Sequence, residues 1–306
     1  MNFKEQKTEL IVILGPTASG KTELAINLAY QLKGEIISAD SRQVYKNMDV
    51  GTGKDLAEYT KDGVEIPYHL IDTCEAGEKY NVARFQTDFA EVFEQIKSRD
   101  NLPILCGGTG LYIQSVISDF WKMQVPLNQN LRVELETFSN EHIFDNFSNF
   151  LTDYKFSSRK RLIRHIEIND FLLKNSEFAK SEFTKLEYKI FGLNPALETR
   201  RERISIRLND RFEKQGMIAE VQNLLDSGVS ADVLEYYGLE YKYISYFLKN
   251  EMSFGQMFTK LETEIHRFAK RQMTFFRSME NKGIEINWIP DSLSKEGKLN
   301  YVLENF

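Results

Sequence analysis

Hydrophobic residues in the first third of the chain form short continuous runs that alternate with helical stripes. The runs LIVIL (10–14), GEIISADS (34–41) and LPILCGGTG (102–110) predict buried strands that end in polar or glycine residues. Thr22 to Leu32 and Asn81 to Arg99 carry apolar side chains at helical spacing, so both predict helices. Strands that alternate with helices are typical of an α/β protein, in which a parallel sheet is covered on both faces and ligands bind at the carboxyl ends of the strands.

Helical periodicity dominates after about Asp119. The pattern predicts helices over 129–139, 158–174, 196–226 with a break near Gly216, 239–249 and 256–281. Two further runs, YKIFGLNP (188–195) and IEINWI (284–289), predict strands, and we expect the first of them to return to the sheet. The second part of the chain is therefore expected to be mostly helical.

The composition is that of an ordinary globular protein. A chain of 306 residues, 42% hydrophobic and 27% charged, can bury a sizeable core and form two units. No apolar run reaches the ~18 residues that cross a bilayer, and the start MNFKEQKTEL lacks the apolar core of a signal peptide. We therefore expect a cytoplasmic protein without a membrane partner. The only cysteines, Cys74 and Cys106, are too few for a disulfide framework and lack the paired spacing of a zinc site.

Residues 15–22 read GPTASGKT and directly follow the run LIVIL. This stretch fits the phosphate-loop pattern G-x-x-x-x-G-K-[ST] in its strand–loop–helix setting. The backbone N–H groups of such a loop surround phosphate oxygens, and the helix that follows directs its positive end at the same anion. We expect Lys21 to neutralise terminal phosphate oxygens and the Thr22 hydroxyl to ligate Mg²⁺. The phosphate-binding residues are thus predicted to be Gly15, Pro16, Thr17, Ala18, Ser19, Gly20, Lys21 and Thr22.

Two further groups lie where parallel strands are predicted to end. Asp40 follows IISA and can ligate the metal, act as a general base or, with Ser41, cap a following helix. Thr109, in the turn GGTG (107–110), can present its backbone and hydroxyl to the same phosphates. By motif alone the loop could bind ATP, because kinases, NTPases and prenyl transferases can all hold a phosphate in this way.

The predicted fold is an α/β sheet like that of P-loop NTPases, parallel and flanked by helices, with a mostly helical second part and a short helical insertion. We expect a P-loop core with the diphosphate site over 1–118 and the insertion over 119–157. The remainder, 158–306, is expected to be a helical part whose strands return to the core sheet.

Three sequence blocks taken together resemble the tRNA dimethylallyltransferase family. These blocks are GPTASGKT, SADSRQVYKNMDVGTGK (38–54) and LCGGTGLY (105–112). The segments similar to downstream parts of the family are SSRKRLIRHIEI (157–168), RRERISIRLNDRFEKQGMIAEV (200–221) and HRFAKRQMTFFR (266–277), so the resemblance covers almost the whole length. It implies Mg²⁺-dependent transfer of a dimethylallyl group from dimethylallyl diphosphate to the exocyclic N6 amine of the adenosine on the 3′ side of the tRNA anticodon, with release of diphosphate.

The residues fit this implied reaction. An adenine amine is a poor nucleophile because its lone pair is delocalised into the ring, so a base such as Asp40 must remove a proton as the new bond forms. Lys21, Mg²⁺ on Thr22 and Thr109 would stabilise the departing diphosphate. The resemblance adds Arg207 as a cationic contact to the diphosphate. Because RISIRLNDRF is one residue longer than the usual pattern, the alternatives at this position are Arg203 and Arg211.

The base must leave its stack in the anticodon loop to reach this site. The resemblance implies that the residues facing it are Asp40, Ser41, Arg42 and Gln43. Basic residues also gather in two predicted helices, 158–174 and 256–281, and Phe268, Phe275 and Phe276 lie near the second cluster. Such clusters are often solvated faces, but their coincidence with the family blocks favours RNA contact. The predicted tRNA contacts are Arg132, Lys160, Arg161, Arg164, Arg267, Lys270, Arg271 and Arg277.

The sequence departs from the family pattern at several points. GTGK (51–54) lacks the usual Ala and following Pro, and the stretch from Asp119 to Ser158 is shorter than the usual insertion. Glu240 stands in YGLEYK (237–242) where the family carries Gly, and it puts an acidic side chain on the expected RNA side. These changes bear on tRNA binding and leave the phosphate chemistry intact.

The net charge of −6 argues mildly against a protein coated for nucleic acid, although it leaves room for local basic patches. The implied partners are the tRNA anticodon stem-loop and dimethylallyl diphosphate, bound by a monomer. The alternatives are a P-loop kinase of small metabolites, a prenyl transferase of free adenine nucleotides, and an RNA-binding protein that has lost catalysis. The last is opposed by the intact set Lys21, Thr22, Asp40 and Thr109.

Overall fold

The computed structural model describes residues 8–118, 125–151, 158–176 and 186–306. The chain divides into two compact units, and each is described by itself. The first unit consists of residues up to 117 together with residues 186–306, and the second covers 118–185. No helix in the described ranges is long and apolar enough to cross a membrane.

The first unit is built on a six-stranded sheet with the order β5-β2-β6-β1-β7-β8, in which every neighbouring pair is parallel. Its strands are β1 (Leu10–Leu14), β2 (Gly34–Ser38), β5 (Tyr68–His69), β6 (Leu102–Gly107), β7 (Tyr188–Leu193) and β8 (Asn287–Ile289). The predicted return of 188–195 to the sheet is confirmed, since β7 pairs with β1 from Leu10↔Tyr188 onwards. A separate hairpin consists of β3 (Thr60–Lys61) and β4 (Val64–Glu65).

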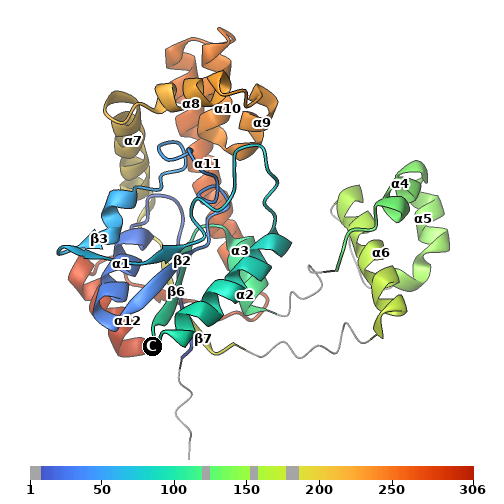
Figure 1. Cartoon of the computed structure of the whole chain (residues 1–306), viewed down its shortest axis with the longest axis horizontal. Helices are drawn as coiled ribbons and strands as arrows, with labels where there is room; N and C mark the ends of the chain where they lie inside the picture. Colours follow the sequence, from blue (N-terminus) through green and yellow to red (C-terminus); the bar gives the residue numbers. More distant parts are fainter. Residues whose placement is uncertain (1–7, 119–124, 152–157, 177–185) are drawn as a thin grey trace, which may run out of the picture. The chain divides into compact units, whose positions relative to one another are not determined.

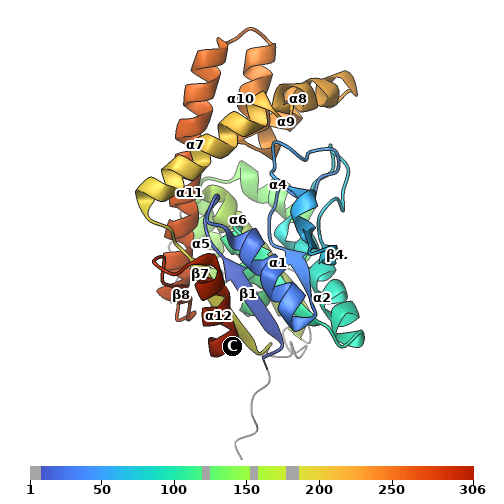
Figure 2. The same cartoon turned by 90° about the vertical axis from the view of Figure 1, so that its left-hand side faces the viewer.

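Helices cover both faces of this sheet, as the continuous apolar runs of its strands require. Side chains of Ile11 and Ile13 pack toward one face, in a core that includes α1 (Lys21–Leu32) and α12 (Lys295–Asn305). Leu10, Val12 and Leu14 point to the other face, against α2 (Val82–Ser98) and α3 (Gly110–Ile117). Figure 2 shows α1 and α12 on the face of the sheet that is turned toward the viewer. The predicted α/β class is confirmed.

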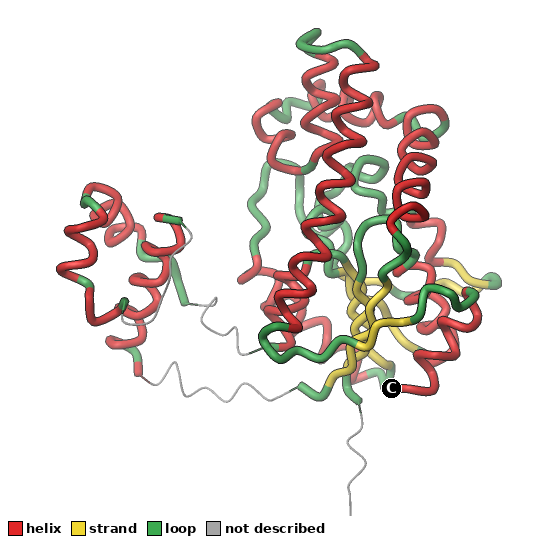
Figure 3. The backbone as a smooth tube through the Cα atoms, turned by 180° about the vertical axis from the view of Figure 1, so that it is seen from behind, coloured by secondary structure: helices red, strands yellow, loops and turns green. Residues whose placement is uncertain are grey.

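A helical part extends from the end of the sheet where β1, β2 and β6 terminate (Figures 1 and 3). It consists of α7 (Leu197–Glu213), α8 (Met217–Asp226), α9 (Ala231–Tyr237), α10 (Leu239–Leu248) and α11 (Phe254–Glu280). The break predicted near Gly216 is present, because this residue takes a φ of 73° between α7 and α8, a conformation that glycine adopts at little cost. A capping box of Ser253 and Gln256 begins α11, whose apolar stripe packs into the core.

The second unit is a small bundle of α4 (Gln129–Thr137), α5 (Asn140–Asn146) and α6 (Arg159–Lys174), with a 3-10 turn at Ser148–Phe150. Its own core contains Leu135, Ile143, Leu162, Ile163 and Ile166. Because α6 packs its apolar side here, it belongs to this compact unit, whereas the sequence pattern placed the end of the insertion at 157. The expected boundary cut between α5 and α6, two helices that share one core.

Candidate active site

The phosphate loop joins β1 to α1 and is shaped by unusual backbone angles. Ala18 has a φ of 61° and Gly20 a φ of 85°, and Gly20 directly precedes the first residue of α1. Gly15 has no room for a side chain, since a Cβ atom there would lie 2.8 Å from the carbonyl oxygen of Leu193 in β7. The loop therefore turns tightly over the sheet, and the amino end of α1 faces the space above it.

This space is a cavity of about 650 Å³, lined by the phosphate loop from Thr17 to Thr22 and by the ends of β2 and β6. Lys21 points into it, and burial lowers the pKa of its ammonium group, while Cys106 and Asp40 act in the opposite direction. Burial raises the pKa of the Cys106 thiol to about 12, so that thiol is neutral at physiological pH. A buried cation in such a cavity favours an anionic ligand.

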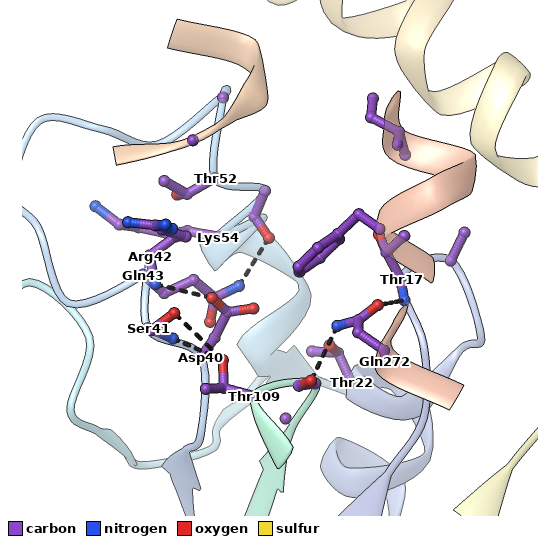
Figure 4. Close-up of a pocket in the computed structure, with 18 of the residues that line it drawn as sticks. Thr17, Thr22, Asp40, Ser41, Arg42, Gln43, Thr52, Lys54, Thr109 and Gln272 are labelled. Atoms are coloured by element: carbon purple, nitrogen blue, oxygen red, sulfur yellow. Dashed lines mark hydrogen bonds between the residues drawn. The ribbon is translucent and has the colours of Figure 1, made fainter. Parts of the chain in front are cut away.

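Asp40 and Thr109 lie together on one side of the cavity (Figure 4). The backbone N–H of Ser41 donates to the Thr109 hydroxyl at 3.0 Å, and the N–H of Arg42 donates to Oδ1 of Asp40 at 2.9 Å. The structure has a turn at 41–44, so Asp40 and Ser41 cap no helix in this described segment. Asp40 is thus fixed by a local turn, with its carboxylate at the cavity wall.

The glycines of the GGTG turn let β2 and β6 approach each other at this point. A Cβ atom at Gly107 would lie 2.2 Å from the carbonyl oxygen of Ala39, so only glycine fits there. Thr109 N–H donates to the same Ala39 carbonyl at 3.1 Å. This close approach brings the Asp40 segment and Thr109 to the same end of the sheet, next to the phosphate loop.

Gln272 on α11 connects the phosphate loop to the GGTG turn. Its Oε1 accepts a hydrogen bond from Thr17 N–H at 2.9 Å, and its Nε2 donates to the carbonyl of Gly108 at 3.0 Å (Figure 4). The sequence analysis did not single this residue out. A signal was present, because Gln272 is a polar residue on the buried stripe of α11, between Ala269 and Phe276.

Two of the three candidate arginines of α7 line the cavity. Arg207 donates from Nη2 to the Thr17 hydroxyl, and Arg211 lies one turn further along the helix. Burial, followed by the charge of Arg211, lowers the pKa of Arg207 to about 10. Arg203 instead lines a neighbouring pocket of about 320 Å³, which is also lined by residues 18–20 of the phosphate loop, by Arg207 and by Lys295 and Lys298. The extra residue in this segment therefore leaves Arg207 beside the phosphate loop.

Glu240 lies inside the cavity at the start of α10. Its side chain is 17% exposed, and its Oε1 is 4.0 Å from Nη1 of Arg211. Burial raises the pKa of Glu240, while Arg211 acts in the opposite direction. The structure places this acidic side chain, expected on the RNA side, in the wall of the cavity, where it faces an arginine.

The segment 49–54 forms another wall, and a carboxylate holds it in place. Glu220 on α8 accepts hydrogen bonds from the N–H groups of Asp49, Val50 and Gly51 at 2.8, 2.7 and 3.0 Å. It also accepts one from the Tyr241 hydroxyl at 2.7 Å. The sequence analysis named this segment only for its resemblance and did not identify the carboxylate that organises it.

Lys54 and Gln43 fix the same segment from the sheet side. The Lys54 side chain is fully buried, and its ammonium group donates to the Tyr45 carbonyl at 2.7 Å and pairs with Asp49 at 2.7 Å and with Asp72. Gln43, expected to face the base, donates from Nε2 to the Gly53 carbonyl at 3.0 Å (Figure 4). The buried ammonium is thus satisfied by three acceptors, as buried charges must be.

The basic side chains predicted on α11 lie on its exposed surface. Arg271 lines the mouth of the cavity and lies over the Phe268 ring, with 5.9 Å between the guanidinium carbon and the ring centroid. Arg267 pairs with Glu264 at 2.5 Å. The other exposed members of this predicted set are Lys270 and Arg277. A cationic and aromatic surface therefore borders the cavity.

The remaining predicted RNA contacts belong to the second unit. Arg132 and Arg164 pair with the buried carboxylate of Glu167, at 2.6 and 3.5 Å, and therefore contribute to the internal structure of the bundle. Arg159 donates to the Leu135 carbonyl at 2.8 Å and joins α6 to α4. The two exposed residues of this set are Lys160 and Arg161. Of the contacts predicted in this unit, Lys160 and Arg161 are thus the two on the exposed surface.

The groups available for Mg²⁺ are oxygen donors. Thr22 contributes a hydroxyl and Asp40 a carboxylate to the same cavity, and such hard donors suit Mg²⁺, which keeps several waters and shares substrate phosphates. Within the described ranges, no group of three or more His, Cys, Asp and Glu side chains forms a dedicated metal site. The donor chemistry therefore fits an ion that arrives with a phosphorylated ligand.

The fold and this cavity together define a P-loop protein whose phosphate loop opens into a cavity beside a carboxylate. The family model described as IPP transferase matches residues 43–279, so the chain belongs to the IPP transferase family. Two bacterial relatives are similar over nearly their whole length. The "tRNA dimethylallyltransferase 1" of Azobacteroides pseudotrichonymphae is 50% identical over 93% of this chain and 94% of that protein, and the "tRNA dimethylallyltransferase 2" of Bacteroides fragilis is 49% identical over 96% of each.

Solved structures show the same similarity. The full-length tRNA isopentenylpyrophosphate transferase of Bacillus halodurans superimposes with a TM-score of 0.72 at 30% identity, covering 97% of this chain and 95% of that one. A eukaryotic dimethylallyltransferase acting on tRNA gives a TM-score of 0.75 at 25% identity, covering 92% of this chain and 74% of that one. The fold is therefore shared with enzymes described as acting on tRNA.

Proposed function

We propose that this chain transfers a dimethylallyl group from dimethylallyl diphosphate to the exocyclic N6 amine of the adenosine on the 3′ side of the tRNA anticodon, and releases diphosphate. One observation carries the proposal: in a chain of the IPP transferase family, the phosphate loop and Asp40 open into a single cavity. The size of about 650 Å³ is in the range of small-molecule sites and suits a prenyl diphosphate with an extruded base. In this proposal the enzyme acts as a monomer in the cytoplasm.

The reaction exchanges one bond for another at the first carbon of the prenyl group. The N6 lone pair forms the N–C bond, the allylic C–O bond breaks, and its electron pair leaves on the diphosphate oxygen. Asp40 accepts the N6 proton, which makes the amine a better nucleophile as the bond forms. The turn that fixes Oδ1 of Asp40 on the Arg42 amide holds this carboxylate ready.

Negative charge grows on the diphosphate as the C–O bond breaks, and the cavity stabilises it. Lys21, Arg207 and the N–H groups of the phosphate loop supply positive charge that is already in place. The Thr109 hydroxyl lies at the same end of the sheet and adds a donor. Thr22 would hold Mg²⁺, which would supply further neutralisation of the diphosphate.

The opposite side of the cavity suits a nucleobase. Ser41, Arg42 and Gln43 line it, and Arg42 also lies over the exposed Tyr236 ring with 5.5 Å to the centroid. The exposed cations of α11 would bind the phosphate backbone near this opening, as single-stranded RNA sites do. A flipped adenosine would therefore present its amine between these side chains and the diphosphate.

The test is a transfer assay with labelled dimethylallyl diphosphate, Mg²⁺ and either unmodified tRNA or AMP. We expect label in tRNA at the adenosine beside the anticodon, and no label in AMP. Asp40→Asn keeps the shape of the side chain but not its basicity, so we expect turnover to fall about 100-fold or more with tRNA affinity nearly unchanged. Label in AMP alone, or phosphate transfer from ATP without prenyl transfer, would contradict the proposal.

A further inference from the structure

Arg211 has an unusual environment for a buried arginine. It is 3% exposed and lies in the cavity wall, yet no residue in the described ranges accepts a hydrogen bond from its Nε or Nη2. Its nearest carboxylate oxygen, on Glu240, is 4.0 Å from Nη1, which is too long for a hydrogen bond. Leaving buried charged donors unmet is costly, so this guanidinium calls for an acceptor that a ligand brings.

The position of Arg211 points to the diphosphate end of the cavity. It lies four residues after Arg207 on α7, so both side chains project from one face of the helix about one turn apart. Arg207 donates to the hydroxyl of Thr17 and so marks the edge of the phosphate loop. Arg211 therefore lines the same cavity as the phosphate loop, about one helical turn from Arg207.

The charge balance supports the same ligand. The cavity brings together three cations, the buried Arg211 and the half-buried Lys21 and Arg207, with the carboxylates of Asp40 and Glu240. Two neighbouring arginines repel each other in a desolvated site, and a ligand with several negative charges relieves that repulsion. The planar guanidinium fork also matches phosphate oxygens, to which it can donate two parallel hydrogen bonds.

Two neighbours hold Arg211 in place. Gly53 has a φ of 67°, and a Cβ atom there would lie 1.9 Å from Nη2 of Arg211, so the guanidinium packs directly on backbone. The Gly53 carbonyl is held by Gln43, and its N–H donates to the Asp49 carbonyl at 2.9 Å. Glu240 offsets part of the charge on Arg211 while leaving its Nε and Nη2 without an acceptor among the described residues.

We propose that Arg211 is a second arginine that binds the diphosphate of the prenyl donor beside Arg207, and that Glu240 is its counter-ion when the donor is absent. This inference rests on the proposed function for the identity of the donor. As the C–O bond breaks, the electron pair passes to the diphosphate oxygen, and Arg211 stabilises the charge that builds there. Glu240 competes with the diphosphate for the same guanidinium and so weakens donor binding.

The direct test is titration calorimetry of the whole chain with inorganic diphosphate in the presence of MgCl₂. We expect Arg211→Met to weaken diphosphate binding by roughly 10- to 100-fold and Arg211→Lys to have a smaller effect, since lysine keeps the charge but loses the fork. Glu240→Gln should strengthen binding by about threefold or more, because the competing charge is removed. The matched control is Arg201→Met, an exposed arginine of the same helix that lines neither this cavity nor the pocket beside it, with unchanged affinity.

Wild-type affinity in Arg211→Met, or weaker binding in Glu240→Gln, would overturn the inference. If Arg211→Met does not fold, Arg211→Lys and Glu240→Gln decide. A merely structural role of Glu240 would not make Glu240→Gln bind diphosphate more tightly than the wild type. A wild-type chain that labels tRNA while Arg211→Met binds diphosphate normally contradicts this inference alone. Diphosphate binding that depends on Arg211 without any prenyl transfer contradicts the proposed function alone.

Discussion

At the scale of single residues, the cavity concentrates buried cations beside carboxylates. Burial lowers the pKa of Lys21, and burial with the charge of Arg211 lowers that of Arg207 to about 10. Neither group gains enough negative charge from Asp40 and Glu240 to offset its desolvation. Keeping desolvated cations close together at one site costs free energy. A bound anion would offset that free energy, so this part of the cavity favours an anionic ligand.

The low pKa of Arg207 gives a prediction with a definite sign. A guanidinium is charged below its pKa, so Arg207 is fully cationic at neutral pH and loses its proton as the pH rises through about 10. Affinity for inorganic diphosphate should therefore fall above pH 10, by about tenfold for each further pH unit. The last ionisation of diphosphate adds negative charge and acts in the opposite direction. Calorimetry between pH 8 and 11, with folding checked by circular dichroism, measures this dependence.

The matched variant for this pH dependence is Arg207→Met. It removes one of the titrating cations, so its diphosphate affinity should be weaker at neutral pH and less sensitive to pH above 10 than that of the wild type, with the remaining dependence due to Lys21, whose pKa is also lowered. A wild-type affinity that stays level up to pH 11 would show that Arg207 does not bind the anion as a titrating cation.

Which site residues could be predicted depends on how each one is positioned. The phosphate loop and Asp40 are local features, because a short motif and the end of a strand place them. Gln272, which was not predicted, and Arg211, which was named only as an alternative to Arg207, belong to helices far away in the sequence, and only tertiary packing brings them to the cavity. Their local signals are a polar residue on a buried stripe and a repeat of arginine at helical spacing.

At the scale of elements, the strongly patterned segments were predicted and the weakly patterned ones were not. Continuous apolar strands and long amphipathic helices, such as β1 and α2, follow from periodicity alone. The helices α9 and α12 were missed, since α9 has seven residues and α12 has only one fully buried side chain, Val302. The two-residue strand β5 depends on its pairing with β2 and carries too little pattern to detect.

The segment 49–54 illustrates how one element positions another. Three consecutive N–H groups converge on Glu220, and the last of them belongs to the buried Gly51. Glu220→Ala would leave these donors without their acceptor and cost about 1–3 kcal/mol of unfolding free energy. The loosened wall should raise the KM for dimethylallyl diphosphate more than it lowers kcat. Urea unfolding and steady-state kinetics measure the two effects, and hydrogen exchange at residues 49–51 locates them.

The control for this element is Glu213→Ala, which removes an exposed carboxylate at the end of α7. It should change neither the unfolding free energy nor amide exchange at 49–51 by a measurable amount. Glu220→Gln keeps one acceptor oxygen and should lie between the alanine variant and the wild type. If exchange at 49–51 stays slow in Glu220→Ala, the carboxylate does not organise this wall.

At the scale of the whole molecule, the chain combines a P-loop α/β core with a second compact unit, a small helical bundle. The core holds the cavity and the exposed cations of α11, whereas the bundle of α4, α5 and α6 has its own apolar centre. The sequence pattern predicted α4 and α6 but not that they share one core. Amphipathicity shows that a helix has a buried face, but it does not show which element packs against that face. Basic residues in the bundle therefore need to be sorted by contact before they are assigned to RNA.

The contacts of these basic residues separate a structural role from RNA binding. Arg132 pairs with the buried carboxylate of Glu167, so Arg132→Met removes one partner of a buried pair and should destabilise the bundle by about 1–3 kcal/mol, with faster amide exchange in α4 and α6. Lys160 is exposed on α6, so Lys160→Ala should leave exchange unchanged. If Lys160 contacts a phosphate, the same change makes the negative slope of log affinity for tRNA against log salt shallower by about 0.7–0.9. Filter binding at several salt concentrations measures the slope. If the slope is unchanged in Lys160→Ala and shallower in a stably folded Arg132→Met, then Arg132 binds RNA and Lys160 does not.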